Sequence, residues 1–250
     1  MFMSSQTQII TLITGAERGL GFEYAKQLGK RGQHIFIGAY DMKLGKKAIA
    51  DLKDQGVDAD LVNCDVTSQE SIDLAIKTID QKYGYLNILI NNAGLGGPQS
   101  KPSETTSAAL HKVFDTNFFG TVAMTNAALP LLKKAPFGKI INVASDMGSL
   151  TLASDPSSML YKFDAFAYPA SKTAVNSMTI AYSKELKDTN VTINSINPGM
   201  TATDLINKKA FQANGAQGVE QGAKRAVELA SDPKNDLNGT FTEEDGKLPW

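Results

Sequence analysis

A tyrosine and a lysine four positions apart are the residues of this chain best suited to do chemistry. They are Tyr168 and Lys172, in the segment Tyr-Pro-Ala-Ser-Lys. Residues at this spacing lie on one face of a helix, and Pro169 suits a first helical turn, where no backbone donor is needed. A positive charge within about 4–6 Å of a phenol lowers its pKa from the ordinary value of about 10. The pair therefore predicts a tyrosine acid/base with a lowered pKa, although ordinary surface helices carry the same spacing by chance.

The composition indicates a single globular domain without an electrostatic bias. The chain has 250 residues, with 25 Lys and Arg against 26 Asp and Glu, which offers no basic surface for nucleic acid or an anionic membrane. Its single cysteine, Cys64, excludes an internal disulfide and is typical of a reducing compartment. With so few cysteines and histidines we expect no metal site. The polar start, Met1 to Gln8, lacks the pattern of a signal peptide, so we expect a cytoplasmic protein.

Short β-rich segments alternate with longer amphipathic ones along the chain. The predicted strands are Ile9–Ile13, His34–Ile37, Asp60–Asn63, Leu86–Asn91, Lys139–Val143, Val191–Ile196 and Gly239–Thr242. The predicted helices are Leu20–Arg31, Lys43–Gln55, Gln69–Tyr83, Ser107–Lys134, Pro169–Lys187 and Glu220–Ser231. Such alternation predicts right-handed βαβ units, and hence a parallel sheet of seven strands with helices on both faces. Because no linker divides the chain, residues 1–250 form one predicted domain.

Two segments interrupt this alternation. Residues 148–164 are an irregular, serine-rich insertion before Tyr168, and residues 201–218 follow a Pro-Gly pair without a clear strand. Long connections in compact domains are often lids or binding loops. We therefore expect residues 201–218 to form a substrate lid, with a solvated excursion as the alternative for either segment.

A glycine-rich turn directly follows the first predicted strand. It reads Thr14-Gly15-Ala16-Glu17-Arg18-Gly19-Leu20-Gly21 and opens the first predicted helix. Glycines in this position let the main chain approach a pyrophosphate, which the amides at the helix N-terminus bind. The turn predicts a dinucleotide site, although a plain glycine-rich turn has the same appearance.

Four further motifs follow later strands and the insertion. They are Asn91-Asn92-Ala93-Gly94, Ser145, the pair Tyr168 and Lys172, and Pro198-Gly199. Together with the glycine turn, they make the chain resemble the short-chain dehydrogenase/reductase family, in its compact, carbonyl-reductase-like branch. The resemblance runs from Thr14 to about Leu205. It implies an α/β, doubly wound (Rossmann) fold and hydride transfer between a nicotinamide cofactor and a carbonyl/alcohol substrate.

The resemblance implies four catalytic residues. Tyr168 would be the general acid/base, and Lys172 would bind the nicotinamide ribose and lower the tyrosine pKa. Ser145 would donate a hydrogen bond to the substrate oxygen. Asn117 would kink the long central helix and anchor a water that relays protons to Lys172. Taken singly, Ser145 could instead cap a turn, and Asn117 could be a buried amide satisfied by backbone.

The insertion supplies three competing serines. Ser154, Ser157 and Ser158 lie closer than Ser145 to the family's usual distance from the tyrosine. Ser145 is favoured because it ends a buried strand at the carboxyl edge of the sheet, where such sites lie.

The cofactor-binding residues implied by the resemblance come from every motif. They are Gly15, Arg18, Gly19, Leu20, Gly21, Tyr40, Asp65, Val66, Asn92, Ala93, Gly94, Tyr168, Lys172, Pro198, Gly199, Thr201 and Thr203. Asp65 could equally be a helix cap or turn residue.

The end of the second predicted strand bears on the choice of cofactor. Ala39 stands where an acid would bind the adenosine ribose of NAD, and Arg18 suits a 2′-phosphate. We therefore expect a preference for NADP(H). NAD(H) is not excluded, because Tyr40 replaces a second arginine and Asp41, shifted by one position, could bind the ribose.

The sequence thus predicts an NADPH-dependent carbonyl reductase with a small-molecule carbonyl or alcohol as substrate. The main alternative is a non-catalytic NADP(H)-binding regulator on the same fold, while an epimerase, dehydratase or enoyl reductase fits the length and the Tyr/Lys spacing less well. Nucleic acid and membrane partners are not expected. The resemblance also implies a homodimer or homotetramer, formed through the helices predicted at 107–134 and 169–187.

Overall fold

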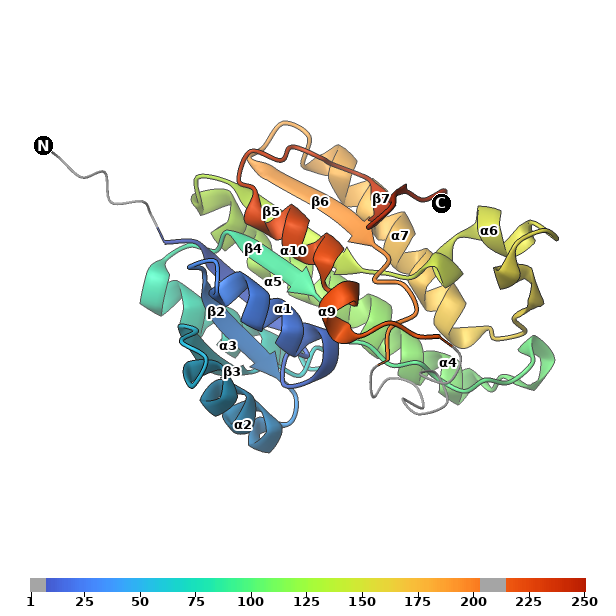
Figure 1. The fold of residues 1–250 in the computed structure, drawn as a ribbon, viewed down its shortest axis with the longest axis horizontal. Helices are drawn as coiled ribbons and strands as arrows, with labels where there is room; N and C mark the ends of the chain where they lie inside the picture. Colours follow the sequence, from blue (N-terminus) through green and yellow to red (C-terminus); the bar gives the residue numbers. More distant parts are fainter. Residues whose placement is uncertain (1–7, 203–214) are drawn as a thin grey trace, which may run out of the picture.

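A twisted parallel sheet forms the centre of the computed structural model, which describes residues 8–202 and 215–250 (Figure 1). Its strands are β1 (Ile10–Thr14), β2 (His34–Ala39), β3 (Ala59–Asn63), β4 (Ile88–Asn91), β5 (Gly138–Val143), β6 (Val191–Ile196), β7 (Phe241–Glu243) and β8 (Gly246–Lys247). Their order is β3-β2-β1-β4-β5-β6-β7-β8. The predicted doubly wound sheet of seven parallel strands is confirmed, and the two-residue β8 adds an antiparallel edge. Strand order reverses between β1 and β4, where folds of this kind bind their ligands.

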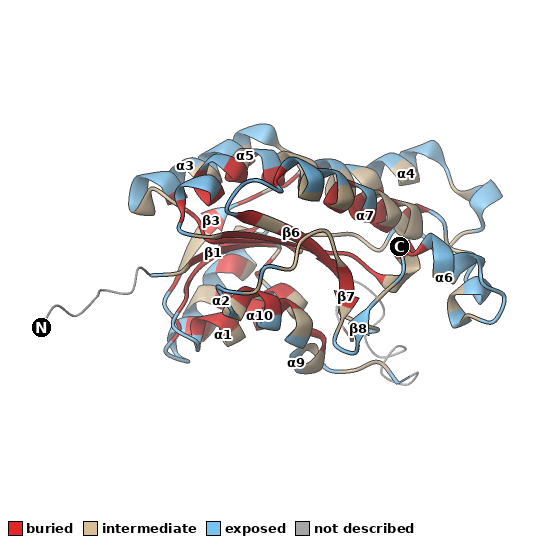
Figure 2. Cartoon of the chain, turned by 90° about the horizontal axis from the view of Figure 1, so that it is seen from above, coloured by how far each residue is buried: buried red, intermediate tan, exposed pale blue. Residues whose placement is uncertain are grey.

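Helices cover both faces of the sheet (Figure 2). They are α1 (Gly19–Gly29), α2 (Met42–Lys53), α3 (Gln69–Tyr83), α4 (Ser107–Phe114), α5 (Gly120–Lys134), α6 (Leu150–Ser154), α7 (Ala167–Glu185), α9 (Val219–Gly222) and α10 (Lys224–Ser231). Helices α1, α2 and α10 lie on one face, and α3, α5 and α7 lie on the other. The arrangement is a three-layer α/β sandwich in one domain.

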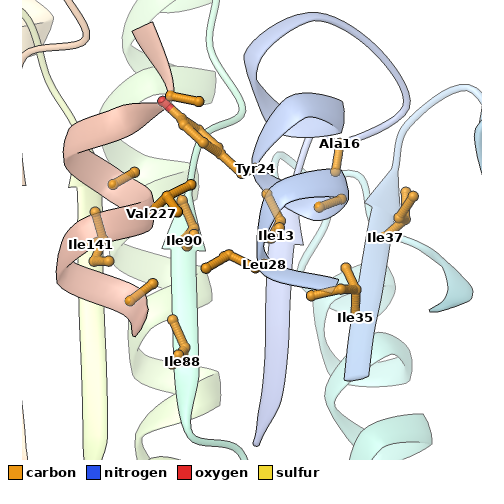
Figure 3. Close-up of a cluster of buried hydrophobic side chains, with 14 of the residues drawn as sticks. Ile13, Ala16, Tyr24, Leu28, Ile35, Ile37, Ile88, Ile90, Ile141 and Val227 are labelled. Atoms are coloured by element: carbon orange, nitrogen blue, oxygen red, sulfur yellow. The ribbon is translucent and has the colours of Figure 1, made fainter. Parts of the chain in front are cut away.

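The central strands are buried because both faces of the sheet are covered. Every residue of β1, β2, β4 and β5 is buried, as the apolar runs in the sequence require of a parallel sheet. On one face, Ile13 and Ile90 pack against Tyr24 and Leu28 of α1 and against Val227 of α10 (Figure 3). This packing fixes α1, and with it the glycine turn that precedes it.

The long helix predicted at 107–134 is interrupted. Helices α4 and α5 are separated by a single π-helical turn, Asp115–Phe119. Asn117 lies at the centre of this turn, where the resemblance placed a kink. Its side chain is buried and bonded to groups outside the helix, which offsets the less regular backbone bonding of such a turn.

The insertion at 148–164 is more ordered than the irregular connection we expected. It contains α6 and a 3₁₀ turn, Met159–Lys162. The Ser149 hydroxyl accepts a hydrogen bond from the Leu152 amide at 3.1 Å, and Ser158 does the same for Leu160. Serine at a helix start satisfies amides that lack a partner in the helix, so the serines that suggested a loop instead begin short helices.

Three further structural findings bear on the expectations above. Most of the predicted lid at 201–218 lies outside the described residues. No described helix has the length and apolar character needed to span a bilayer. Over residues 8–202 and 215–250, no three His, Cys, Asp or Glu side chains gather in a way that would hold a metal ion.

Candidate active site

A cavity of about 700 Å³ lies at the carboxyl ends of β1 to β5. It joins the glycine turn, the ends of β2 and β3, and the start of α7. Thirteen of the predicted site residues line it: Gly15, Arg18, Gly19, Leu20, Tyr40, Asp65, Val66, Asn92, Ala93, Gly94, Tyr168, Lys172 and Pro198. Residues from motifs that are far apart in the sequence thus share one elongated site.

Asn92 holds the glycine turn against the end of β4. Its side-chain amide donates to the carbonyl oxygens of Thr14 at 2.8 Å and Gly15 at 3.0 Å. The Thr14 hydroxyl in turn accepts bonds from the amides of Asn92 and Ala93, both at 3.0 Å. Gly15 and Gly19 have φ angles of +62° and +59°, which residues with a side chain rarely adopt. The turn is therefore shaped before any ligand binds.

The first turn of α1 opens into the same cavity. Gly19 and Leu20 lie at the start of the helix and line the cavity. The first amides of a helix have no partner within the helix, and they make its N-terminus a site for anions. Main-chain donors, together with a turn shaped by glycine, fit the pyrophosphate of a dinucleotide.

The end of β2 presents Tyr40 to the cavity, whereas Asp41 has another role. Tyr40 lines the cavity and is 71% exposed. The Asp41 carboxylate caps α2 by accepting bonds from the amides of Lys43 at 2.9 Å and Leu44 at 3.1 Å. The structure thus uses Asp41 as a helix cap, not as a lining residue of the cavity.

Asp65 both makes a turn and lines the cavity. Its carboxylate accepts bonds from the amide and the hydroxyl of Thr67, at 2.9 and 2.7 Å. The N-cap of α3 is Ser68, not Asp65. The turn interpretation is therefore correct. Asp65 also lines the cavity, and its contact with adenine stays a prediction.

Tyr168 and Lys172 lie together in the first turns of α7. The lysine ammonium is 5.6 Å from the centroid of the tyrosine ring and donates to the Val143 carbonyl at the end of β5, at 2.6 Å. Lys172 is only 5% exposed. Burial disfavours the charged amine and lowers the pKa of Lys172 to about 8.

The pKa of Tyr168 changes in the direction opposite to the one we expected from its spacing to Lys172. The residue as a whole is half-buried, but its phenol group lies deep among protein atoms, and this burial raises its pKa to about 12. The Ser145 hydroxyl beside it lowers the pKa, and the negative charge of Asp146 raises it. The prediction of a lowered pKa was wrong, because burial of the phenol raises its pKa by more than the Ser145 hydroxyl lowers it.

Ser145 is placed beside the tyrosine by the end of β5. Its hydroxyl donates to the Asp146 carboxylate at 3.0 Å and accepts from the Met147 amide at 3.2 Å. The competing serines are engaged within the insertion: Ser154 bonds the Thr151 carbonyl, Ser157 bonds Asp155, and Ser158 caps a 3₁₀ turn. The geometry favours Ser145 among the four.

Asn117 connects three parts of the site without lining the cavity. Its amide group donates to the Leu95 carbonyl and the Ser171 hydroxyl, both at 2.9 Å, and its oxygen accepts from the Leu95 amide at 2.7 Å. Leu95 follows the Asn-Ala-Gly motif, and Ser171 precedes the site lysine. Asn117 thus holds the cofactor-side loop against α7.

The remaining predicted residues are divided between supporting positions and a segment that is not described. Gly21, Ser145, Gly199 and Thr201 are outside the cavity lining, and Thr203 lies outside the described residues. The Thr201 hydroxyl donates to the Pro198 carbonyl at 3.0 Å and stabilises the loop after β6.

Several lining residues were missed by the sequence reasoning. They are Glu17, Cys64, Thr67, Leu95, Gly96, Lys112, Asp115, Thr116, Val143 and Ala144. Most directly adjoin a motif residue, so extending each motif by one or two positions would have found them. Lys112 comes from α4 and carried no such signal.

A nicotinamide-type oxidoreductase is the class of enzyme that this fold and this set of residues define. The family model for short chain dehydrogenases matches residues 9–214. The chain is 32% identical to the short-chain dehydrogenase anuI of Penicillium roqueforti, over 98% of both chains. It therefore belongs to the short-chain dehydrogenase/reductase family, whose enzymes act on CH–OH and C=O groups.

Further similarities support this assignment. The chain is 31% identical to a cyclopentanol dehydrogenase of Comamonas testosteroni, over 78% of this chain and 74% of that one. Among solved structures, actinorhodin polyketide ketoreductase with NADPH superposes with a TM-score of 0.83 at 26% identity, covering 97% of both chains. A carbonyl reductase from chicken fatty liver shares the fold, with a TM-score of 0.82 at 23% identity over 97% of this chain.

Proposed function

We propose that the protein is an NADPH-dependent carbonyl reductase, and an alcohol dehydrogenase in the reverse direction. The observation that carries this proposal is that Tyr168 and Lys172, with Ser145 beside the tyrosine, line the same cavity as the glycine turn. The bound cofactor supplies the hydride. The glycine turn and the amides at the start of α1 would hold its pyrophosphate, and Lys172 and Pro198 would contact its nicotinamide half.

The chain's own residues supply the proton and orient the substrate. In reduction, Tyr168 donates its phenolic proton to the carbonyl oxygen as this gains negative charge, and a pKa of about 12 keeps that proton in place at neutral pH. Ser145 stabilises the same oxygen by donating a hydrogen bond. Since a hydroxyl has one proton, its bond to Asp146 must be given up first. Burial lowers the pKa of Lys172 to about 8, which is still above neutral pH.

Arg18 and the end of β2 support the preference for NADPH. Arg18 and Tyr40 both line the cavity, and a guanidinium suits a phosphate group. The Asp41 carboxylate, which could have repelled a 2′-phosphate, is directed at the amides that begin α2. The similar ketoreductase was solved with NADPH, which agrees with this choice. Ketones are the substrate class we favour, since both that protein and the cyclopentanol dehydrogenase act on ketone/alcohol pairs.

The test is NADPH consumption across a panel of aldehydes, ketones, diketones and quinones, with Tyr168→Phe measured alongside. Removal of the proton donor should lower kcat by about 10²–10⁴-fold. The Kd for NADPH should change little, because the phenol oxygen alone is lost. Tyr182→Phe is the matched control: it removes a hydroxyl from the same helix, where that hydroxyl donates to the Asn126 side chain at 2.6 Å. Full activity of Tyr168→Phe would overturn the mechanism.

The same experiment distinguishes a regulator from an enzyme. Tight NADPH binding without turnover of any member of the panel would favour the non-catalytic alternative.

We also propose a homo-oligomer formed through the outer faces of α5 and α7. The ring of Phe119, just before α5, is 55% exposed and would be covered in such an assembly. Light scattering coupled to size exclusion tests this, and a monomer with full activity would contradict it.

A further inference from the structure

The residue after Ser145 is an acid that the catalytic scheme leaves without a role. Asp146 begins a 3₁₀ turn, Asp146–Gly148, shortly after β5. Its Oδ1 atom accepts hydrogen bonds from the Ser145 hydroxyl at 3.0 Å and from the Met147 amide at 2.8 Å. Asp146 is half-buried and is not among the residues that line the cavity. Its carboxylate therefore acts on the site through Ser145 and through its charge.

The turn that carries Asp146 is packed tightly against α7. The Gly148 carbonyl accepts hydrogen bonds from the Thr173 hydroxyl at 3.1 Å and from the Asn176 side-chain amide at 3.4 Å. Gly148 also lies so close to the main chain of α7 that an added Cβ would come within 2.7 Å of it. Since Tyr168 is in the first turn of the same helix, this packing sets the position of Asp146 relative to the tyrosine.

The Ser145 hydroxyl has a single proton, and the structure gives that proton to Asp146. A carboxylate only accepts hydrogen bonds, so the serine must be the donor of the bond between them. The Ser145 oxygen in turn accepts from the Met147 amide at 3.2 Å. Toward Tyr168 it can then act only as an acceptor, which suits a phenol that carries its proton. A phenolate would need a donor, and the serine could supply one only by giving up Asp146.

Charged side chains of three elements share the site with Tyr168. Asp146 lies in the 3₁₀ turn, Lys172 is on α7 itself, and Lys112 and Asp115 come from α4 and the π turn and line the same cavity. Burial is the main cause of the raised tyrosine pKa, the neighbouring serine hydroxyl lowers that pKa, and the negative charge of Asp146 raises it. The hydrogen-bond arrangement and the charge thus both favour the protonated phenol.

We propose that Asp146 is a positioning residue that keeps Ser145 and Tyr168 in the state ready for carbonyl reduction, by holding the serine proton away from the phenol oxygen. This inference rests on the proposed function, which makes Tyr168 the proton donor. In reduction, the carbonyl oxygen that gains negative charge competes with Asp146 for the serine proton. In alcohol oxidation the phenolate must form first, and Asp146 raises the pH at which it forms. The overall equilibrium between carbonyl and alcohol is unaffected, whereas the pH profile of the enzyme depends on Asp146.

The experiment measures the pH dependence of kcat/KM in both directions, at saturating cofactor, for the wild type, Asp146→Asn and Asp146→Ala. The probes are NADPH with the member of the carbonyl panel that the wild type reduces fastest, and NADP⁺ with the corresponding alcohol. Asparagine keeps the shape and an acceptor for the Met147 amide but removes the charge. Alanine removes the acceptor as well, so one variant remains if the other folds poorly. The matched control is Glu185→Gln, which removes the same charge in the exposed last turn of α7, about 25 Å along the helix from Tyr168.

We expect the midpoints of both profiles to lie about one pH unit lower in Asp146→Asn than in the wild type, the order expected for removing one nearby charge. Asp146→Ala should shift them at least as far. Oxidation needs the phenolate and should begin at lower pH, and reduction needs the phenol and should be lost at lower pH.

Two results overturn the inference and leave the proposed function standing. One is a fall in kcat without a shift of either midpoint, because a residue that only supports the fold would behave in this way. The other is a shift that Glu185→Gln reproduces, because the effect would then come from net charge and not from the place of Asp146. A wild type that reduces no member of the panel overturns the proposed function, and this inference with it.

Discussion

Replacing the buried Asn117 by alanine should destabilise the protein more than replacing an exposed asparagine does. The side chain is 1% exposed and makes three hydrogen bonds, two to the main chain of Leu95 and one to the Ser171 hydroxyl, at 2.7 to 2.9 Å. Each net contribution is about 1 kcal/mol, so the loss is about 3 kcal/mol. For a chain of this size each kcal/mol corresponds to roughly 2–4 °C, which predicts a fall in Tm of about 6–12 °C.

The assay is thermal unfolding followed by circular dichroism, with two comparison variants. Asn126→Ala lies on the same helical rod but loses one exposed bond, from the Tyr182 hydroxyl at 2.6 Å, and should lower Tm by only about 1–4 °C. Asn117→Asp keeps the acceptor for the Leu95 amide but sets a buried carboxylate oxygen against the Leu95 carbonyl, so it should lower Tm at least as much as Asn117→Ala. NADPH affinity should fall with Asn117→Ala, because Leu95 belongs to the cavity lining. The reasoning is refuted if Asn117→Ala and Asn126→Ala have the same Tm.

Three other perturbations test separate features. Gly148→Ala would place a Cβ 2.7 Å from the main-chain carbon of Lys172, so we expect a destabilisation of about 1–3 kcal/mol and a lower kcat; urea unfolding and kinetics should show both. The hydrogen bond to His34 lowers the pKa of Asp58, so the bond stabilises the fold above the ordinary carboxyl pKa, and this stabilisation is lost as the pH falls through the lowered pKa. The difference in unfolding free energy between the wild type and Asp58→Asn should therefore shrink from pH 6 to pH 3. A constant difference would contradict this. Burial raises the pKa of the Cys64 thiol to about 12, so a thiol reagent should modify it at neutral pH only after unfolding, and rapid modification of the native protein would be the contrary result.

The fold was predictable because its signals are local. Each buried strand is a short apolar run such as Ile140–Val143, and each strand end is followed by a turn with recognisable residues. A parallel sheet makes these ends converge at one edge, so the motifs at Gly15, Asn92 and Ser145 had to meet once the strand order was correct. The helix breaks were not predictable in this way. The π turn at Asn117 depends on bonds to Leu95 and Ser171, which are 22 and 54 positions away.

The role of an acid after a strand also depends on contacts that a motif does not encode. Asp41 and Asp65 both follow a strand and both accept bonds from amides two or three positions later. Only Asp65 also lines the cavity. Glu17 had no place in the expected pattern, yet its carboxylate lies enclosed there. Whether such an acid lines the cavity depends on the direction of its side chain. The Asp41 carboxylate is turned to the amides that begin α2, whereas Asp65 bonds Thr67 within the cavity lining.

The direction of the tyrosine pKa shift shows most clearly what the spacing of two residues in the sequence does not predict. Four positions on a helix bring Tyr168 and Lys172 together, but the same arrangement buries both groups. Burial disfavours each charged form, so it raises the pKa of the phenol to about 12 and lowers that of the amine to about 8. The Ser145 hydroxyl lowers the pKa of the phenol, but burial outweighs it. The phenol therefore keeps the proton that carbonyl reduction requires, whereas alcohol oxidation must first remove it.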